Sequence, residues 1–145
     1  MRGDDKSLLY AITINISELL YQASGVKYYK VMVAHGTRLV MGAVADTCEK
    51  YGMEAVCSGP SSCSYNTNRC KITPLSTDCG GPMTPLSKLL CNGKTPSGCP
   101  RIDGMFAAWK YNNWGSCGAV DGSWCVQGKD YVSQADKPFF AYCTN

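Results

Sequence analysis

The chain has 145 residues, of which 45% are hydrophobic and 17% are charged, and its formal net charge is +3. Its lysines and arginines are scattered, so no basic run can follow a phosphate backbone, and we expect no nucleic-acid binding. No apolar run approaches the roughly 20 residues of a membrane-spanning helix. The length suits one domain with a short N-terminal extension.

Ten cysteines, an even number, all lie after residue 47. They are Cys48, Cys57, Cys63, Cys70, Cys79, Cys91, Cys99, Cys117, Cys125 and Cys143. Scattered cysteines in even number are typical of disulfides formed in an oxidising compartment. Zinc is the alternative, but no two cysteines have the CxxC spacing and the chain has one histidine. The sequence therefore predicts a secreted protein, or the extracellular part of a larger one.

Residues 1–24 form the expected extension, and residues 25–145 the disulfide-rich domain. Two patterns compete over residues 7–24. A helix would place apolar residues at heptad spacing: Leu9, Ile12, Ile16, Leu19 and Ala23. A strand would instead alternate Ile12, Ile14 and Ile16 with polar residues. The helical pattern includes more of the residues than the strand pattern does, and Gly25 would end the helix. The interpretation is therefore a short helix that can assemble a homo-oligomer. Asn15 begins the sequon Asn15-Ile16-Ser17 and is the predicted glycosylation site.

Helix and strand signals alternate with irregular stretches in the rest of the chain. Aromatic and β-branched residues predict a strand over residues 25–33. A helix is expected over residues 38–51, with Thr37 as its cap, Cys48 facing the core and Gly52 ending it.

Between residues 54 and 99, six cysteines lie among many Gly, Pro, Ser and Asn residues, which predicts irregular backbone held by local disulfides. One short helix is expected there, over residues 85–90. Further strands are expected over residues 104–109, 123–126 and 139–143. The fold class is thus a small disulfide-rich α+β domain.

The order of these features resembles a C-type-lectin-like domain. Such domains open with a strand like residues 25–31, continue with a helix that ends in a cysteine and then a glycine, and close on an aromatic-cysteine strand like residues 139–143. The resemblance implies two disulfides, Cys48–Cys143 and Cys117–Cys125. It also implies that residues 7–24 act as the trimerising coiled coil of soluble members. The family's calcium and sugar-reading tripeptides, Glu-Pro-Asn, Gln-Pro-Asp and Trp-Asn-Asp, are absent, so any sugar binding would not require calcium.

Catalytic signals are weak. His35 is the only histidine and lies beside Gly36 in an expected turn, where a surface role is favoured over catalysis. The loops also contain scattered carboxylates that a hydrolase would need to pair: Asp103, Asp121, Asp130 and Asp136. Asp121 and Asp130 could bind calcium, but Asp121-Gly122 is more typical of a turn. We therefore expect no enzyme, no metal and no cofactor.

Aromatic residues near the C-terminus give the functional hypothesis. Trp109 ends an apolar run and Trp124 precedes Cys125, so both are interpreted as core residues. The remaining residues of the segment combine two rings with two amides: Tyr111, Asn112, Asn113 and Trp114. Such rings can cover the apolar face of a sugar while amides bond its hydroxyls. These four residues are the predicted ligand-binding site.

The sequence thus predicts an extracellular, lectin-like domain that recognises a glycan or a cell-surface or matrix protein. The alternative is a structural or oligomerisation module of an extracellular matrix or cell-surface protein, in which disulfides give durability.

Overall fold

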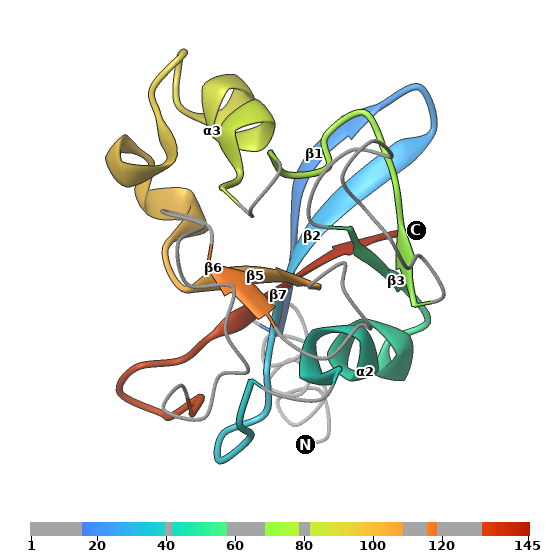
Figure 1. The fold of residues 1–145 in the computed structure, drawn as a ribbon, viewed down its shortest axis with the longest axis vertical. Helices are drawn as coiled ribbons and strands as arrows, with labels where there is room; N and C mark the ends of the chain where they lie inside the picture. Colours follow the sequence, from blue (N-terminus) through green and yellow to red (C-terminus); the bar gives the residue numbers. More distant parts are fainter. Residues whose placement is uncertain (1–15, 40–41, 58–68, 79–81, 109–115, 119–131) are drawn as a thin grey trace, which may run out of the picture.

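The computed structural model describes residues 16–39, 42–57, 69–78, 82–108, 116–118 and 132–145. Within these ranges the chain forms a small α+β domain in which a mixed sheet separates helix α2 (Ala43–Lys50) from helix α3 (Thr84–Leu90) (Figure 1). The predicted α+β class is therefore confirmed. Neither of these two helices has the length and apolar character needed to span a membrane.

The N-terminal hairpin corrects the expected helix over residues 7–24. Ser17–Ala23 is strand β1, and it pairs antiparallel with β2 (Val26–Met32). Ser24 and Gly25 connect the two strands with φ angles of 52° and 81°. Positive φ at both central residues is the signature of a type I′ hairpin turn, which matches the twist of the flanking strands. Gly25 therefore turns a hairpin instead of ending a helix.

The predicted heptad seam is also wrong over this strand, because the burial of its leucines does not follow a helix. Leu19, expected in the seam, is 47% exposed, whereas Leu20 is buried. The pairing register of β1 shifts between Leu19 and Tyr21, and Leu20, at this irregularity, is the residue of β1 that is buried. A coiled coil spanning all of residues 7–24 is therefore wrong over Ser17–Ala23; residues 1–15, including Asn15, lie outside the described residues.

The C-terminal strand β7 (Phe140–Thr144) is the centre of the sheet. It pairs antiparallel with β2 and with β3 (Glu54–Val56), and β3 pairs parallel with β4 (Cys70–Lys71). It also pairs parallel with β5 (Met105–Ala108), which pairs antiparallel with β6 (Ser116–Gly118). Two short 3-10 helices, η2 (Pro96–Gly98) and η3 (Pro100–Ile102), precede β5.

Two apolar cores form because successive side chains of a strand point to opposite faces. In β7, Ala141 and Cys143 join the core under α2, while Tyr142 joins the core under α3. In β5, Phe106 and Met105 divide in the same way. Strands buried on both faces are consequently apolar along their whole length, as β5 is.

Helix α2 begins later than expected. Arg38 forms a bridge with Val132, and Leu39 is fully buried, so this part of the segment is not helical. The helix starts after Gly42, whose φ of 83° is left-handed, and Thr37 is not its cap. Cys48 does face the core from the last turn, and the helix ends before Gly52 as expected.

The other expected elements agree where they can be compared. Strands expected over residues 25–33, 104–109 and 139–143 correspond to β2, β5 and β7, and the helix expected over residues 85–90 corresponds to α3. The strand expected over residues 123–126 lies outside the described residues.

Three disulfides join described cysteines. Cys48–Cys143 ties the last turn of α2 to β7, with Cα atoms 5.6 Å apart. The other two are local, as the middle of the sequence predicts: Cys57–Cys70 between β3 and β4, and Cys91–Cys99 between α3 and η3.

Candidate functional site

The four predicted ligand-binding residues, Tyr111, Asn112, Asn113 and Trp114, lie between β5 and β6 in the chain and outside the described residues. The strands that flank them are described. Ala108, the last residue of β5, is paired with Ser116, the first residue of β6. Cys117 lies in β6, and its expected partner Cys125 lies outside the described residues.

Strand β5, which leads into residues 109–115, is buried and paired along both edges. All four of its residues are buried, and it is paired on both sides, with β6 and with β7. The Phe106 ring meets the Phe139 ring edge to face, with centroids 5.1 Å apart. The chain therefore enters residues 109–115 from a buried strand and leaves them into β6, which is paired with that strand.

A second candidate is a groove between helix α2 and the chain that follows β2, here named the α2 groove. Its cavity volume is about 330 Å³. It is lined by Met32, Ala34, Thr37, Arg38, Ala43, Asp46, Thr47, Lys50 and Tyr51. The sequence does not predict this groove, because its two walls come from segments that are brought together only in the fold.

Charged side chains on the outer face of α2 form an ion-pair network. Arg69 pairs through Nη2 with Asp46, and also with Glu49 at 2.8 Å. Its Nε donates a further hydrogen bond to Glu49 Oε2 at 3.3 Å. Hydrogen bonds to Glu49 and Asp46 raise the pKa of Arg69 above its usual value. Asp46 and Glu49 are three residues apart, a spacing that places them on one face of a helix.

A second hollow, of about 260 Å³, is mainly apolar. It lies between the β1–β2 hairpin, the turn at Pro74 and Leu75, and Leu89 of α3, which is 48% exposed. The Leu75 carbonyl accepts a hydrogen bond from Tyr142, and the Leu75 amide donates to Thr73 Oγ1.

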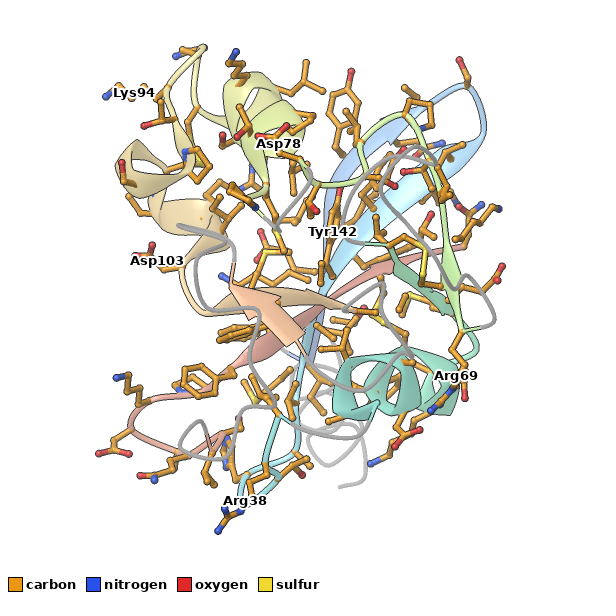
Figure 2. The ribbon with its side chains drawn as sticks, in the orientation of Figure 1. Arg38, Arg69, Asp78, Lys94, Asp103 and Tyr142 are labelled. Atoms are coloured by element: carbon orange, nitrogen blue, oxygen red, sulfur yellow. A yellow bond between two sulfur atoms is a disulfide. The ribbon has the colours of Figure 1, made fainter. Side chains whose placement is uncertain are left out.

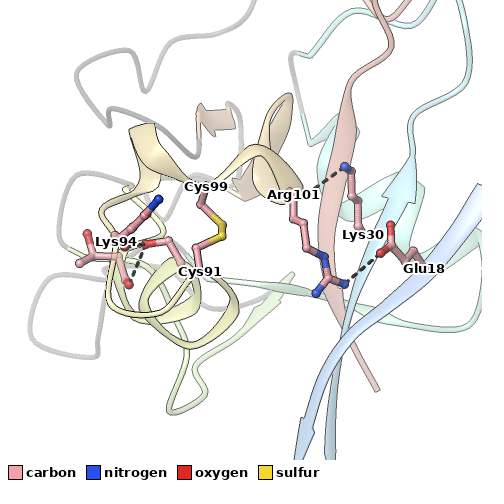
Figure 3. The surroundings of a disulfide bond; sticks show 8 residues. Glu18, Lys30, Cys91, Lys94, Cys99 and Arg101 are labelled. Carbon is pink, nitrogen blue, oxygen red and sulfur yellow. Dashed lines mark hydrogen bonds and ion pairs between the residues drawn. A yellow bond between two sulfur atoms is a disulfide. The ribbon is translucent and has the colours of Figure 1, made fainter.

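Lys30 belongs to a network that joins β1, β2 and η3 (Figure 3). Its Nζ donates to the Arg101 carbonyl at 3.0 Å and lies 4.5 Å from the centre of the Phe140 ring. Arg101 in turn pairs with Glu18 at 3.0 Å. Burial lowers the pKa of Lys30, while Glu18 and Asp103 oppose that shift. These contacts connect β1, β2 and η3. Lys30, Arg101 and Glu18 are not among the described residues that line either hollow.

Within the described part of the chain, no group of three or more His, Cys, Asp or Glu side chains is arranged to hold a metal ion. His35 is exposed in a turn whose Gly36 amide bonds the Ser133 carbonyl. No protein-family model matches the sequence, and neither the curated proteins nor the solved structures compared with it give a match.

Proposed function

We propose that this chain is an extracellular recognition domain of the C-type-lectin-like type. It binds a glycan or a cell-surface protein through Tyr111, Asn112, Asn113 and Trp114, and the binding does not require calcium. The observation that carries the proposal is the pairing of Ala108 with Ser116. Because this pair places both ends of residues 109–115 on paired strands, of which β5 is buried, a ligand-binding segment there would be attached to a rigid support.

The disulfides support the extracellular part of the proposal. Three disulfides join the described cysteines, and such bonds persist in oxidising compartments. One of them, Cys48–Cys143, is the pair that the resemblance to C-type-lectin-like domains implies. It connects the helix to the last strand across 95 residues of chain.

A glycan array and a panel of cell-surface proteins test the recognition site. Trp114→Ala should abolish the binding that the wild-type chain shows, because the variant removes the largest ring of the segment. Leu89→Ala is the matched control, since it removes an exposed apolar side chain from α3. Disulfide mapping and thermal unfolding show whether each variant is folded. Binding that persists in a folded Trp114→Ala protein contradicts the proposal.

Absence of any ligand for the wild-type chain would favour the alternative, a structural or assembly module. Light scattering then gives the oligomeric state of the whole chain and of a chain lacking residues 1–15. That truncation is preferred to the removal of residues 1–24, because the longer cut would delete β1 from the sheet. A monomer in both cases would contradict assembly through the N-terminal segment.

A further inference from the structure

We propose that the α2 groove is a second binding site, and that it takes an acidic sugar residue such as a hexuronate. This inference rests on described residues alone and does not depend on Tyr111–Trp114.

The charges in the groove favour an anion. Among the described residues that line the groove, Arg38 and Lys50 contribute a cation to each wall and Asp46 contributes a carboxylate. Asp46 is already paired with Arg69, which lies outside the lining. Figure 2 shows Arg38 on the chain that follows β2 and Arg69 beside α2. The described lining residues therefore have a formal charge of +1, and Asp46 among them shares Arg69 with Glu49.

The shape and apolar surface of the groove favour a small ring. Its volume of about 330 Å³ is at the lower end of the roughly 300–1,000 Å³ of ligand pockets, which suits one ring more than an extended polymer. Tyr51 is 39% exposed and offers a flat apolar face. Lys50 Nζ lies 5.6 Å from the centre of that ring, so a cation and an aromatic face stand together.

Hydroxyl groups complete the match to a sugar. Thr47 Oγ1 donates its hydrogen to the Ala43 carbonyl at 2.9 Å, which leaves the oxygen able to accept a hydrogen bond. Thr37 adds a second hydroxyl from the opposite wall. Sugar hydroxyls are donors and acceptors, so they suit these oxygens better than the hydrogen-free oxygens of sulfate or acetate do. A carboxylate on the ring would engage Lys50.

The test is a titration of ¹⁵N-labelled protein with sodium glucuronate, followed by amide chemical shifts. Saturable shifts should appear at Thr47, Lys50 and Tyr51, with a dissociation constant on the order of 1–10 mM for a ligand this small. Glucose has the ring without the carboxylate, and acetate has the carboxylate without the ring. Each should bind at least about tenfold more weakly, a factor that corresponds to losing one good interaction.

Two variants and a matched control locate the site. Lys50→Met keeps the apolar stem and removes the charge, and Tyr51→Ala removes the ring; each should weaken glucuronate binding by about tenfold or more. Lys88→Met is the control, because Lys88 is an exposed lysine in the last turn of α3 as Lys50 is in the last turn of α2. It should bind like the wild type, and so should Trp114→Ala.

Equal binding of glucose and glucuronate would overturn the assignment of an acidic ligand, and equal binding of acetate would overturn the need for a ring. Shifts absent from α2, or shifts unchanged in a folded Lys50→Met protein, would overturn the site itself. Because Trp114→Ala is scored separately, failure here is distinguishable from failure of the proposed function.

Discussion

The hydroxyl of Tyr142, in the middle of β7, donates a 2.9 Å hydrogen bond to the backbone carbonyl of Leu75, 67 residues earlier in the chain. The Tyr142 ring is fully buried and lies 5.9 Å from the ring of Tyr28. This bond connects the central strand to the irregular segment after β4, where regular secondary structure is sparse. The buried Tyr142 side chain thus adds a tertiary contact to a segment that also has local hydrogen bonds at Thr73.

Tyr142→Phe should lower the free energy of unfolding by about 1–2 kcal/mol, because the Leu75 carbonyl loses its side-chain donor while the ring contacts remain. Urea denaturation of the two proteins measures the difference. Tyr51→Phe, at an exposed position, should change stability by less than about 0.5 kcal/mol. Equal effects of the two variants would show that the Tyr142 hydroxyl contributes nothing.

Tyr142 also predicts a loss of stability in alkaline solution. Burial, with a smaller contribution from Tyr28, raises the pKa of Tyr142 well above its usual range. The unfolded chain ionises near pH 10, before the folded chain does. The stability from neutral, buried Tyr142 is therefore complete below about pH 10 and is lost above it, by up to about 1.4 kcal/mol per pH unit. Unfolding measured from pH 8 to 11 should show this slope in the wild type and a smaller slope in Tyr142→Phe.

Local patterns predicted α2, α3, β2, β5 and β7 because each depends on neighbouring residues, whereas β3 and β4 lie where irregular backbone was expected. The spacing of Val44 and Cys48 fixed the buried face of α2, and both side chains are buried. The start of α2 was not predictable, since Leu39 is held by the core and Arg38 by Val132, a partner 94 positions later. The two periodicities over residues 7–24 overlapped, and the Ser24-Gly25 turn favours the strand for Ser17–Ala23.

The sheet order and the α2 groove could not be read from the sequence. Strand β7 pairs with three strands that are distant from it in the chain, and the groove needs residues from both β2 and α2. The disulfide Cys48–Cys143 came from a resemblance, because cysteine spacing alone leaves the pairing open. The recognition role of Tyr111 and Trp114 stays a prediction.

The disulfides should differ in their contribution according to the length of chain that each closes. The Cys48–Cys143 loop spans 95 residues and the Cys91–Cys99 loop spans 8. Chain entropy gives about 4.7 kcal/mol for the first and about 2.5 kcal/mol for the second. Replacing each pair with alanine and measuring urea denaturation compares them. A larger loss for the Cys91–Cys99 pair would contradict the chain-entropy account.

Arg69→Met should destabilise the protein by about 1 kcal/mol, because Arg69 joins the start of β4 to two carboxylates of α2. The destabilisation should be smaller in 1 M salt, because the Debye length there is about 3 Å and exposed charges are screened from one another. Arg101→Met is the matched control, since Arg101 pairs with one carboxylate of the described residues, Glu18, at an exposed site. It should cost less than about 0.5 kcal/mol. A loss that salt does not reduce would indicate that Arg69 acts through packing of its stem.

Leu19 and Leu20 separate the strand from the helix at the N-terminus. In β1, Leu20 is buried beside Tyr28 and Met83 in the core under α3, whereas Leu19 is 47% exposed. Leu20→Ala should therefore cost about 2–3 kcal/mol, and Leu19→Ala less than about 0.5 kcal/mol. A heptad helix would give the opposite order, because its seam contains Leu19 and not Leu20. Urea denaturation of the two variants decides between them, and a larger loss for Leu19→Ala would mean that the segment is not paired with β2 as a strand.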